Sequence, residues 1–250
     1  MILQDNINRL KRLLKESHRI TVFTGAGIST ESGIPDFRSP GGLWTKHKPI
    51  QFQDFITSAE KRKESWRIKL KLDSMLATAT PNKGHKALVT LFESGRLSSV
   101  ITQNIDGLHQ ASGIPDDRVI ELHGNTTYAA CLDCKKRYEL DVIKKIFDVD
   151  ETLPVCDDCG GMIKTATISF GQAMPEEEMK KAEKETLDCD LFLAIGSSLV
   201  VYPAAGFPIM AKQNGAKLVI INRDETPLDE IADLVINSEI GETLSEAVKM

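Results

Sequence analysis

Short, nearly continuous apolar runs recur along the chain and alternate with longer stretches in which apolar residues return every three or four positions. The runs are rich in valine and isoleucine, which is typical of parallel strands buried on both faces. Helical periodicity lies between them, for example at 81–94 and 203–214. We expect the strands at 20–24, 99–102, 118–122, 191–195, 217–221 and 233–236. The alternation predicts an α/β fold with a doubly wound, Rossmann-like parallel sheet.

The amino-terminal segment predicts an amphipathic helix. Its apolar residues recur on one face, at Ile7, Leu10, Leu13 and Leu14. Asp5 or Asn6 is expected to cap the start of this helix, because short polar side chains accept hydrogen bonds from the free N–H groups of a first turn. Charges interrupt its apolar positions, so the segment does not resemble a secretory signal.

Two stretches interrupt the alternation. Residues 40–80 begin with proline and glycine and continue as a charged helical segment, whereas residues 124–167 hold four of the five cysteines and no long apolar run. We expect both to be insertions that form a second, smaller lobe. The sheet domain then consists of 1–39, 81–123 and 168–250.

Composition narrows the class of protein. The chain has 250 residues with a formal net charge of −5, which disfavours general nucleic-acid binding because that function needs a basic surface. No apolar run approaches the roughly 18–20 residues that cross a bilayer. Five cysteines are too few for a disulfide scaffold. We therefore expect a cytoplasmic protein with no direct nucleic-acid or membrane partner.

The paired cysteines predict a metal site. Cys131 and Cys134 form one C-x-x-C pair, Cys156 and Cys159 form another, and the 21 residues 135–155 separate them. Four thiolates satisfy tetrahedral zinc and leave no coordination position open, so one structural Zn²⁺ ion is expected rather than a catalytic one. Disulfides are the less favoured alternative in a reducing compartment.

A glycine loop follows the first predicted strand. Gly25 and Gly27 open a short helix there, where glycine lets the backbone approach a phosphate and helix N–H groups face its charge. Thr30 stands where the dinucleotide fingerprint has its third glycine, and no acidic residue ends a strand about twenty positions later. Gly33 and Pro35 are expected to end the helix almost at once. An ordinary hydride-transferring dehydrogenase is therefore disfavoured.

Polar side chains follow two further predicted strands. Gln103, Asn104 and Asp106 come after one of them, and His123 comes after the next. Amides and a carboxylate at the carboxyl edge of a sheet can hold a ribose or a carboxamide, and histidine can take a proton near neutral pH. On residue type alone, the first group could equally cap a helix and His123 could be structural.

Longer motifs carry a family resemblance. The segments Gly25-Ala-Gly-Ile-Ser29, Ser32-Gly-Ile-Pro-Asp-Phe-Arg38 and Gly42-Leu-Trp44 resemble the cofactor loop of the sirtuins, the NAD-dependent protein-lysine deacylases. Further blocks match this family in the same order, and the paired cysteines lie between the second and the third of them. These blocks are Gln103-Asn-Ile-Asp106 with Leu108-His109, Glu121-Leu-His-Gly124, and Gly196-Ser-Ser-Leu-Val-Val201.

The resemblance implies site residues. His123 and Asn104 are the implied catalytic residues, with His123 as the base. An extended substrate peptide is implied to be clamped at Phe170, Gly171, Val200 and Val201. NAD, which is consumed as a co-substrate, is implied to contact Gly25, Ala26, Gly27, Ser29, Thr30, Pro35, Asp36, Phe37, Arg38, Gln103, Asn104, Ile105, Asp106, His123, Gly196, Ser197, Ser198, Asn222, Arg223, Asp224 and Ile240.

The implied function is NAD-dependent removal of acetyl groups from N6-acetyl-lysine in proteins, with release of nicotinamide and O-acetyl-ADP-ribose. Preference for another acyl group and mono-ADP-ribosyl transfer are the alternatives on the same scaffold. Two other classes each explain part of the sequence. A zinc-ribbon nucleic-acid module leaves the glycine loop unused, and an NAD-binding oxidoreductase lacks the third glycine and the ribose-binding acid.

The chain also departs from the family pattern near the expected peptide groove. Gln172 stands where the family usually has glutamate, and Thr165 replaces a frequent proline. Relatives that prefer succinyl-lysine carry a Tyr-x-x-Arg pair in the helical insertion, and Trp66 and Lys69 take the corresponding positions here. We therefore expect a preference for the acetyl group.

Overall fold

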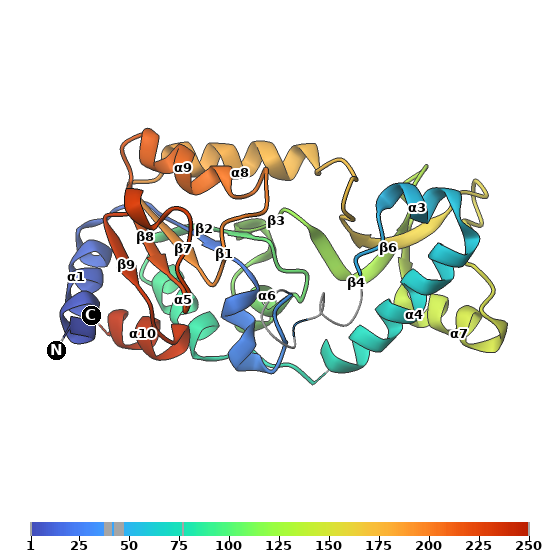
Figure 1. The fold of residues 1–250 in the computed structure, drawn as a ribbon, viewed down its shortest axis with the longest axis horizontal. Coiled ribbons are helices and arrows are strands. Elements are labelled where there is room, and N and C mark those ends of the chain that lie inside the picture. The colour runs from blue at the N-terminus through green and yellow to red at the C-terminus, as the bar shows by residue number, and fades with distance from the viewer. Residues whose placement is uncertain (1, 38–41, 43–47, 77, 250) are drawn as a thin grey trace.

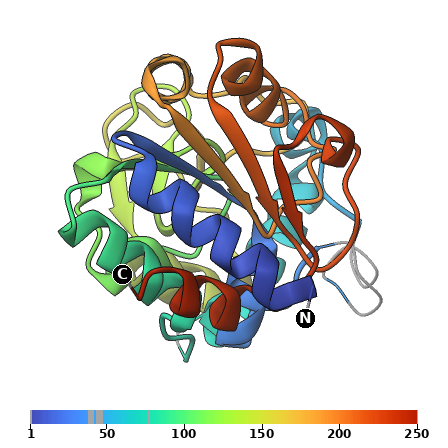
Figure 2. The same cartoon turned by 90° about the vertical axis from the view of Figure 1, so that its left-hand side faces the viewer.

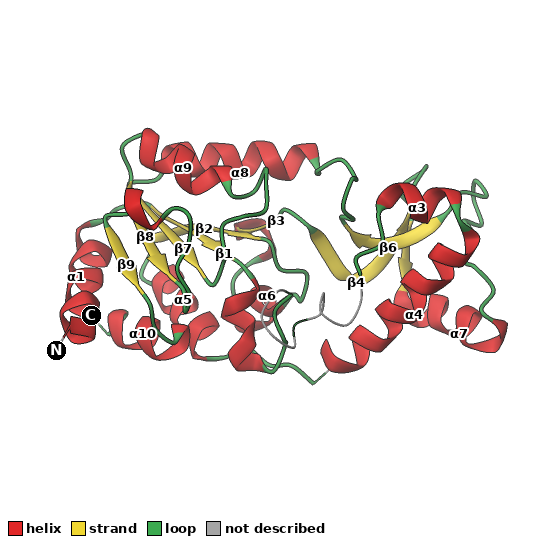
Figure 3. Ribbon diagram, viewed as in Figure 1, coloured by secondary structure: helices red, strands yellow, loops and turns green. Residues whose placement is uncertain are grey.

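The protein is described by a computed structural model that covers residues 2–37, 42, 48–76 and 78–249. Its two sheets lie toward opposite ends of an elongated molecule, and both chain termini lie at the end that holds the larger sheet (Figures 1 and 3). The larger sheet is parallel and has six strands, and the smaller is antiparallel and has three. No helix in these ranges is long and apolar enough to span a bilayer.

The parallel sheet confirms the doubly wound fold. Its strands run in the order β3-β2-β1-β7-β8-β9, so the first three extend to one side of β1 and the last three to the other. Ligands bind at the point between β1 and β7 in such sheets, because the crossovers leave in opposite directions there. The strands are β1 (Ile20–Thr24), β2 (Leu97–Thr102), β3 (Val119–Glu121), β7 (Leu191–Ile195), β8 (Lys217–Ile221) and β9 (Leu234–Ile236).

Helices cover both faces of this sheet, which explains its continuous apolar runs. Helices α1, α5 and α10 lie on one face, and α8 and α9 lie on the other (Figures 1 and 2). Ile20 and Val22 of β1 pack toward the first group, and Phe23 packs toward the second. The sheet and these helices, which we call the large lobe, include α1 (Ile2–Glu16), α5 (Lys83–Glu93), α8 (Glu176–Asp188), α9 (Gly206–Gln213) and α10 (Ile240–Ala247).

The predicted starts of α1 and β2 in the large lobe were wrong. Helix α1 begins at Ile2, so Asp5 lies in its first turn and caps nothing. A carboxylate there is still favourable, because it faces the positive end of the helix dipole. Strand β2 begins two residues earlier than expected, since Ser98 is an extra residue in a bulge between the pairs Ile20–Leu97 and Thr21–Ser99.

The small lobe consists of the antiparallel sheet β5-β4-β6 and three helices around it (Figure 1). Trp66 of α4 is buried among the side chains of this sheet and of α7. The helical insertion was predicted, whereas the strands within 124–167 were not. The elements are α3 (Phe52–Thr57), α4 (Ala59–Leu76), β4 (Gly124–Cys131), β5 (Arg137–Glu139), α7 (Leu140–Asp150) and β6 (Ile163–Thr167).

Short helical turns complete the structure and connect the strands of the large sheet. The first of these follows β1 directly and carries the glycine loop, as the sequence predicts. These turns are η1 (Ala26–Ser32), α6 (Leu108–Ser112), η2 (Asp116–Arg118) and η3 (Asp229–Ile231).

Candidate active site

Three glycines bring the loops after β1 and β7 into backbone contact. The N–H of Gly25 donates to the carbonyl of Ile195 at 3.0 Å, and the N–H of Gly27 donates to that of Gly196 at 2.8 Å. A Cβ on Gly27 would lie 2.7 Å from the Cα of Gly196. Gly196 itself has φ +63°, and its Cβ would lie 2.4 Å from the nitrogen of Ile28. Only glycine fits where these two loops cross. The crossing places η1 at the point between β1 and β7 where ligands bind in such sheets.

The glycine loop ends as quickly as predicted. Gly33 adopts φ +85° and closes η1, and its N–H donates to the carbonyl of Thr30 at 3.0 Å. Asn82, which caps α5, donates through Nδ2 to the carbonyl of Ile28 at 2.7 Å and to Ser32 Oγ at 2.9 Å. The loop is therefore fixed on both sides, by β7 and by the start of α5.

Asn104 and Asp106 face the glycine loop from the end of β2. Asn104 Nδ2 donates to the carbonyl of Gly25 at 3.1 Å and to Ser29 Oγ at 3.2 Å, and Ser29 Oγ donates to Asp106 Oδ2 at 2.8 Å. Burial raises the pKa of Asp106, while hydrogen bonds from the N–H of Leu108 and from Ser29 oppose that shift. Asp106 also accepts from the first N–H of α6, so the capping role is real and coexists with its place in the site.

His123 lies beside the same segment. Its Nδ1 is 3.0 Å from the carbonyl oxygen of Gln103. Since a carbonyl only accepts, Nδ1 carries the proton of the neutral ring and Nε2 keeps its lone pair. Burial lowers the pKa of His123, although the bond to Gln103 partly opposes the shift. The ring is therefore neutral near pH 7 and has the tautomer that a general base needs.

A pocket of about 350 Å³ opens between the glycine loop and the segment after β2. Its walls are mostly apolar, and the side chains of Asn104 and Asp106 lie at its polar end. Two residues from α4, Leu72 and Leu76, complete the wall, and the sequence analysis did not identify them. The lining residues are Ala26, Ser29, Ile34, Pro35, Phe37, Leu72, Leu76, Asn104, Ile105 and Asp106.

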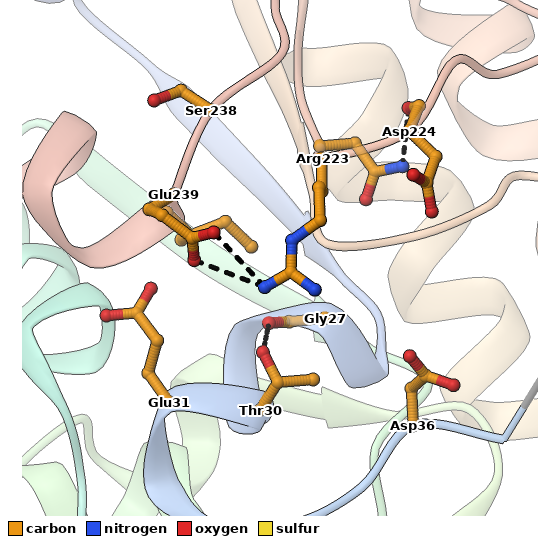
Figure 4. Close-up of a pocket in the computed structure, with 10 residues that line it drawn as sticks. Gly27, Thr30, Glu31, Asp36, Arg223, Asp224, Ser238 and Glu239 are labelled. Carbon is orange, nitrogen blue, oxygen red and sulfur yellow. Dashed lines mark hydrogen bonds and ion pairs between the residues drawn. The ribbon is translucent and has the colours of Figure 1, made fainter. Parts of the chain in front are cut away.

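A second pocket, of about 400 Å³, lies on the other side of the glycine loop (Figure 4). Arg223 reaches across it to Glu239, with Nη2 3.2 Å from the carboxylate, and Thr30 Oγ1 donates to the carbonyl of Gly27 at 2.9 Å. This pocket is polar, in contrast to the first. Its lining residues are Gly27, Thr30, Glu31, Asp36, Asn222, Arg223, Asp224, Ser238, Glu239 and Ile240.

Most of the expected NAD contacts line one of the two pockets. Arg38 lies outside the described residues. The expected contacts that are described but line neither pocket are Gly25, Gln103, His123, Gly196, Ser197 and Ser198. Ser197 Oγ instead accepts from Gln103 Nε2 at 2.8 Å, and Ser198 is exposed.

The expected peptide clamp begins beside His123. The N–H of Ile168 donates to the carbonyl of His123 at 2.8 Å, and Phe170 follows two residues later with its side chain 40% exposed. The carbonyl of Phe170 accepts from the N–H of Phe52 at the start of α3. Gly171 turns the chain with φ +78°. After β7, Val200 is another exposed apolar side chain and Val201 is half-buried.

The four paired cysteines converge as expected for zinc. Their sulfurs all lie within 4.8 Å of one another, with Cys131 Sγ 3.5 Å from Cys159 Sγ and Cys134 Sγ 3.6 Å from Cys156 Sγ. Tetrahedral zinc with Zn–S bonds of about 2.3 Å places its sulfurs about 3.8 Å apart. The donor set therefore fits one Zn²⁺ ion and leaves no ligand position for a substrate.

The two cysteine pairs are built alike. Each is followed by a residue in the left-handed conformation, Lys135 with φ 64° and Gly160 with φ 72°. The N–H of that residue donates to the carbonyl of the first cysteine of its pair, Cys131 or Cys156. This repeated turn points both sulfurs of a pair at one ion. Tyr138 also donates to Cys156 Sγ and lowers the pKa of that thiol to about 6, which favours the thiolate that zinc binds.

Trp66 and Lys69 do not have the place that the sequence suggested. Trp66 is 2% exposed and packs in the core of the small lobe, next to the zinc knuckles. Lys69 is also buried and is paired with Asp73, one turn along α4. Burial lowers the pKa of Lys69 to about 8. Neither residue lines the described pockets, where α4 contributes Leu72 and Leu76 instead.

Comparison with known proteins agrees with this geometry. The chain is 57% identical over 246 residues to the NAD-dependent protein deacetylase 1 of Bradyrhizobium diazoefficiens, covering 98% of this chain and 96% of the relative. It is 53% identical to the NAD-dependent protein deacetylase of Rhodopseudomonas palustris, covering 98% and 97%.

Solved structures are similar over the same length. A Sir2 protein with a p53 peptide and NAD⁺ has a TM-score of 0.86 at 38% identity, covering 95% of both chains. A Sir2 variant with a deacetylated p53 peptide and 3′-O-acetyl ADP-ribose has a TM-score of 0.87 at 36% identity, covering 97% of both. A family model described as the Sir2 family matches residues 25–203. The matched segment includes the glycine loop, the residues after β2 and β3 and both cysteine pairs. This chain therefore belongs to the Sir2 family.

Proposed function

We propose that this protein is an NAD-dependent protein-lysine deacetylase, which uses NAD and water to remove the acetyl group from N6-acetyl-lysine. The products are nicotinamide, O-acetyl-ADP-ribose and the free lysine. One observation supports this proposal most strongly. A neutral histidine with its Nε2 lone pair available lies beside the segment that supplies Asn104 and Asp106 to an apolar pocket. The names of the similar proteins support the same activity.

The two pockets suggest how NAD lies. The polar pocket would hold the adenosine half, where Asn222 and Asp224 offer partners for hydroxyl groups and Ile240 an apolar wall. The apolar pocket would hold the nicotinamide half. The crossing of Gly27 and Gly196 lies between them, and the absence of side chains there would let the diphosphate approach the backbone closely.

The polar residues in and beside the apolar pocket would have separate roles in binding and in proton transfer. Asn104 and Asp106 would bind the carboxamide and the ribose, which need donors and acceptors together. His123 would accept a proton through Nε2 from a ribose hydroxyl and so make that oxygen a nucleophile toward the acyl carbon. The apolar wall formed with Leu72 and Leu76 would keep water from the reacting atoms.

Substrate proteins would bind as an extended acetyl-lysine peptide. Phe170 and Val200 expose apolar side chains at the ends of two segments that begin at the site, which suits strand addition on either side of a peptide. The Zn²⁺ ion would only stabilise the small lobe. The division into a domain of 1–39, 81–123 and 168–250 with insertions at 40–80 and 124–167 stays a prediction, as does a cytoplasmic location.

The test is incubation with NAD and an acetyl-lysine peptide, followed by nicotinamide release and the mass of the peptide. We expect equal amounts of nicotinamide and deacetylated peptide. His123→Ala should lower kcat by about 10²–10⁴-fold, the usual cost of losing a general base, with little change in NAD affinity. His18→Ala is the matched control, because His18 is exposed and remote from the site. NADH formation would indicate an oxidoreductase, and an ADP-ribosylated peptide would indicate a transferase.

The pH profile gives a second readout of the same residue. A base must be neutral to accept a proton, and burial holds the pKa of His123 below its usual value of about 6.5. Activity should therefore persist below pH 6.5 and fall only as the pH drops through the lowered pKa. A rising limb above pH 7 would contradict the assignment of His123.

A further inference from the structure

A chain of buried hydrogen bonds lies behind Asn104. His109 Nε2 of α6 is 2.8 Å from Thr24 Oγ1, the last residue of β1, and Thr24 Oγ1 donates to Thr102 Oγ1 of β2 at 2.8 Å. Thr102 Oγ1 in turn accepts from the backbone N–H of Asn104 at 3.0 Å. All four residues are buried. The position of the Asn104 backbone therefore depends on groups that cannot exchange their partners for bulk water.

The directions of these bonds fix the proton on His109. Thr24 gives its only hydroxyl proton to Thr102, so it must accept from His109. His109 is therefore protonated on Nε2 and keeps a lone pair on Nδ1. Burial lowers the pKa of this ring to about 3, which keeps it neutral.

His85 of α5 has the complementary arrangement. It is fully buried, and its Nδ1 accepts from the N–H of Asn82 at 3.4 Å, so its proton is on Nε2. The two rings are 5.1 Å apart between centroids. His85 Nε2 and His109 Nδ1 are buried and have no hydrogen-bond partner among the described residues. One is a donor and the other is an acceptor, on neighbouring rings.

We propose that His85 and His109 are positioning residues, which relay one continuous, one-directional hydrogen-bond chain from Asn82 to Thr102 and so hold Asn104 against the glycine loop. The link between the two rings runs from His85 Nε2–H to His109 Nδ1 through one water, because the two nitrogens do not bond directly. The consequence for catalysis rests on the proposed function, because it assumes that Asn104 acts on NAD.

Asn82 connects this chain of hydrogen bonds to η1. Its side chain holds Ile28 and Ser32 of η1, and its backbone N–H begins the relay to His85. At the other end, Asn104 Nδ2 reaches the carbonyl of Gly25 and Ser29 Oγ. The glycine loop and the segment after β2, which both contribute residues to the apolar pocket, are thus held by one set of polar contacts. A pair of histidines that only filled space would have no such directionality.

The first test reads the tautomers directly and needs no activity. In ¹⁵N NMR spectra of the wild-type protein, we expect both His85 and His109 as neutral Nε2–H rings from pH 5 to pH 9. The exposed His18 serves as the internal reference, since it lies outside the chain of buried hydrogen bonds. An Nδ1–H tautomer or a protonated ring at either position would overturn the relay.

The second test removes one link of the chain without changing the shape of a side chain. Thr102→Val should lower kcat at least tenfold and also raise the KM for NAD, because Asn104, which would bind the carboxamide and the ribose, loses the contact that holds its backbone N–H. Thr90→Val is the matched control, since Thr90 is exposed and its hydroxyl donates to the carbonyl of Lys86, one turn earlier in the same helix. Equal kcat values for Thr102→Val and wild type would overturn the proposal.

The third test asks for rescue. Glutamine at position 109 offers both a donor and an acceptor, whereas phenylalanine offers neither. We expect His109→Gln to keep kcat within about threefold of the wild type and His109→Phe to lose at least tenfold. Identical losses in both folded variants would indicate packing alone. A wild-type protein without deacetylase activity would refute the proposed function, yet the tautomers would still decide the relay.

Discussion

The six strands of the large lobe lie between apolar helix faces on both sides, whereas the three strands of the small lobe surround a core of only a few side chains. Two of the residues in that small core are cysteines of the zinc site, Cys131 and Cys156. The large lobe therefore rests on apolar area, which is spread over many residues. The small lobe is stabilised by few contacts, so the loss of one contact lowers its stability more than a similar loss in the large lobe.

Buried charge distinguishes the lobes further. Lys164 of β6 is 3% exposed, and its Nζ donates to the carbonyl of Thr167 at 2.5 Å and lies 5.9 Å from the ring of Phe55. Burial lowers the pKa of this lysine to about 8. The strand it braces leads directly to the Phe170 segment. A buried polar contact thus braces the strand that leads to Phe170, while backbone packing at glycines fixes the loops after β1 and β7.

The largest effect should come from the zinc site. Cys131→Ser removes one of four thiolates, and structural zinc contributes about 10–16 kcal/mol of apparent binding energy in small zinc domains. We expect loss of zinc and of nearly all deacetylation. Hydrogen exchange should show the amides of β4 and β6 unprotected and those of β1 and β7 still protected.

Cys189→Ser provides the control for that variant, because Cys189 is buried in the large lobe and lies outside the cluster. It should retain one zinc ion per chain and full protection of β4. An unchanged melting temperature and full zinc content in Cys131→Ser would contradict a structural metal, and uniform loss of protection in both sheets would mean that the lobes are not independent.

The next effect should come from the glycine crossing of the large lobe. An alanine at Gly196 has a strained positive φ and a Cβ 2.4 Å from the backbone of Ile28. Strain and overpacking together should lower the free energy of unfolding by about 2–5 kcal/mol. NAD affinity should fall as well, because the loops after β1 and β7 must separate. Urea unfolding and calorimetric titration with NAD measure the two effects.

Gly95→Ala separates strain from contact. Gly95 has φ +74°, similar to that of Gly196, but nothing lies within 4 Å of its Cβ position. It should cost only about 1–2 kcal/mol and leave NAD affinity unchanged. If Gly196→Ala and Gly95→Ala lowered the free energy of unfolding equally, the close approach of the loops after β1 and β7 would not determine the stability of the large lobe.

The same contrast explains what the sequence could predict. All six strands of the large sheet were predicted, because burial on both faces leaves an apolar run that is readable without knowledge of its partners. The strands of the small lobe were not. The β4 segment Gly124–Cys131 mixes threonine and alanine with one tyrosine, so its pairing depends on β5, β6 and zinc.

The residues of the candidate site also differ in whether the sequence could predict them. The residues after β1, β2 and β3 could be predicted, since the carboxyl edge of a parallel sheet gathers whatever follows its strands. The contribution of α4 could not. Its apolar residues from Trp66 to Leu72 alternate with charged ones, a period of two that does not reveal which helix face is buried. Trp66 was placed near the acyl group by the family resemblance and not by this pattern, and Leu72 and Leu76 were missed.

The smallest effect concerns the choice of acyl group. A succinyl group ends in a carboxylate, and burying that charge is costly unless a fixed cation meets it. The described wall of the apolar pocket contains no cation, its one ionisable side chain is Asp106, and the ammonium of Lys69 is paired with Asp73. We expect acetyl-lysine to be preferred over succinyl-lysine at least tenfold in kcat/KM, or roughly 1.4 kcal/mol.

A cation placed on the wall should weaken this preference, because it would give the carboxylate a partner. Leu72→Arg puts one there, and Leu72→Gln is the control of similar polarity without charge. Trp66→Tyr should leave the acetyl-to-succinyl ratio unchanged, since Trp66 packs away from the pocket in the small-lobe core. Kinetics on one peptide carrying either acyl group measure all of these ratios. Equal turnover of both groups by the wild type would refute the preference, and a changed ratio in Trp66→Tyr would mean that the small-lobe core, and not the wall at Leu72, controls the acyl group.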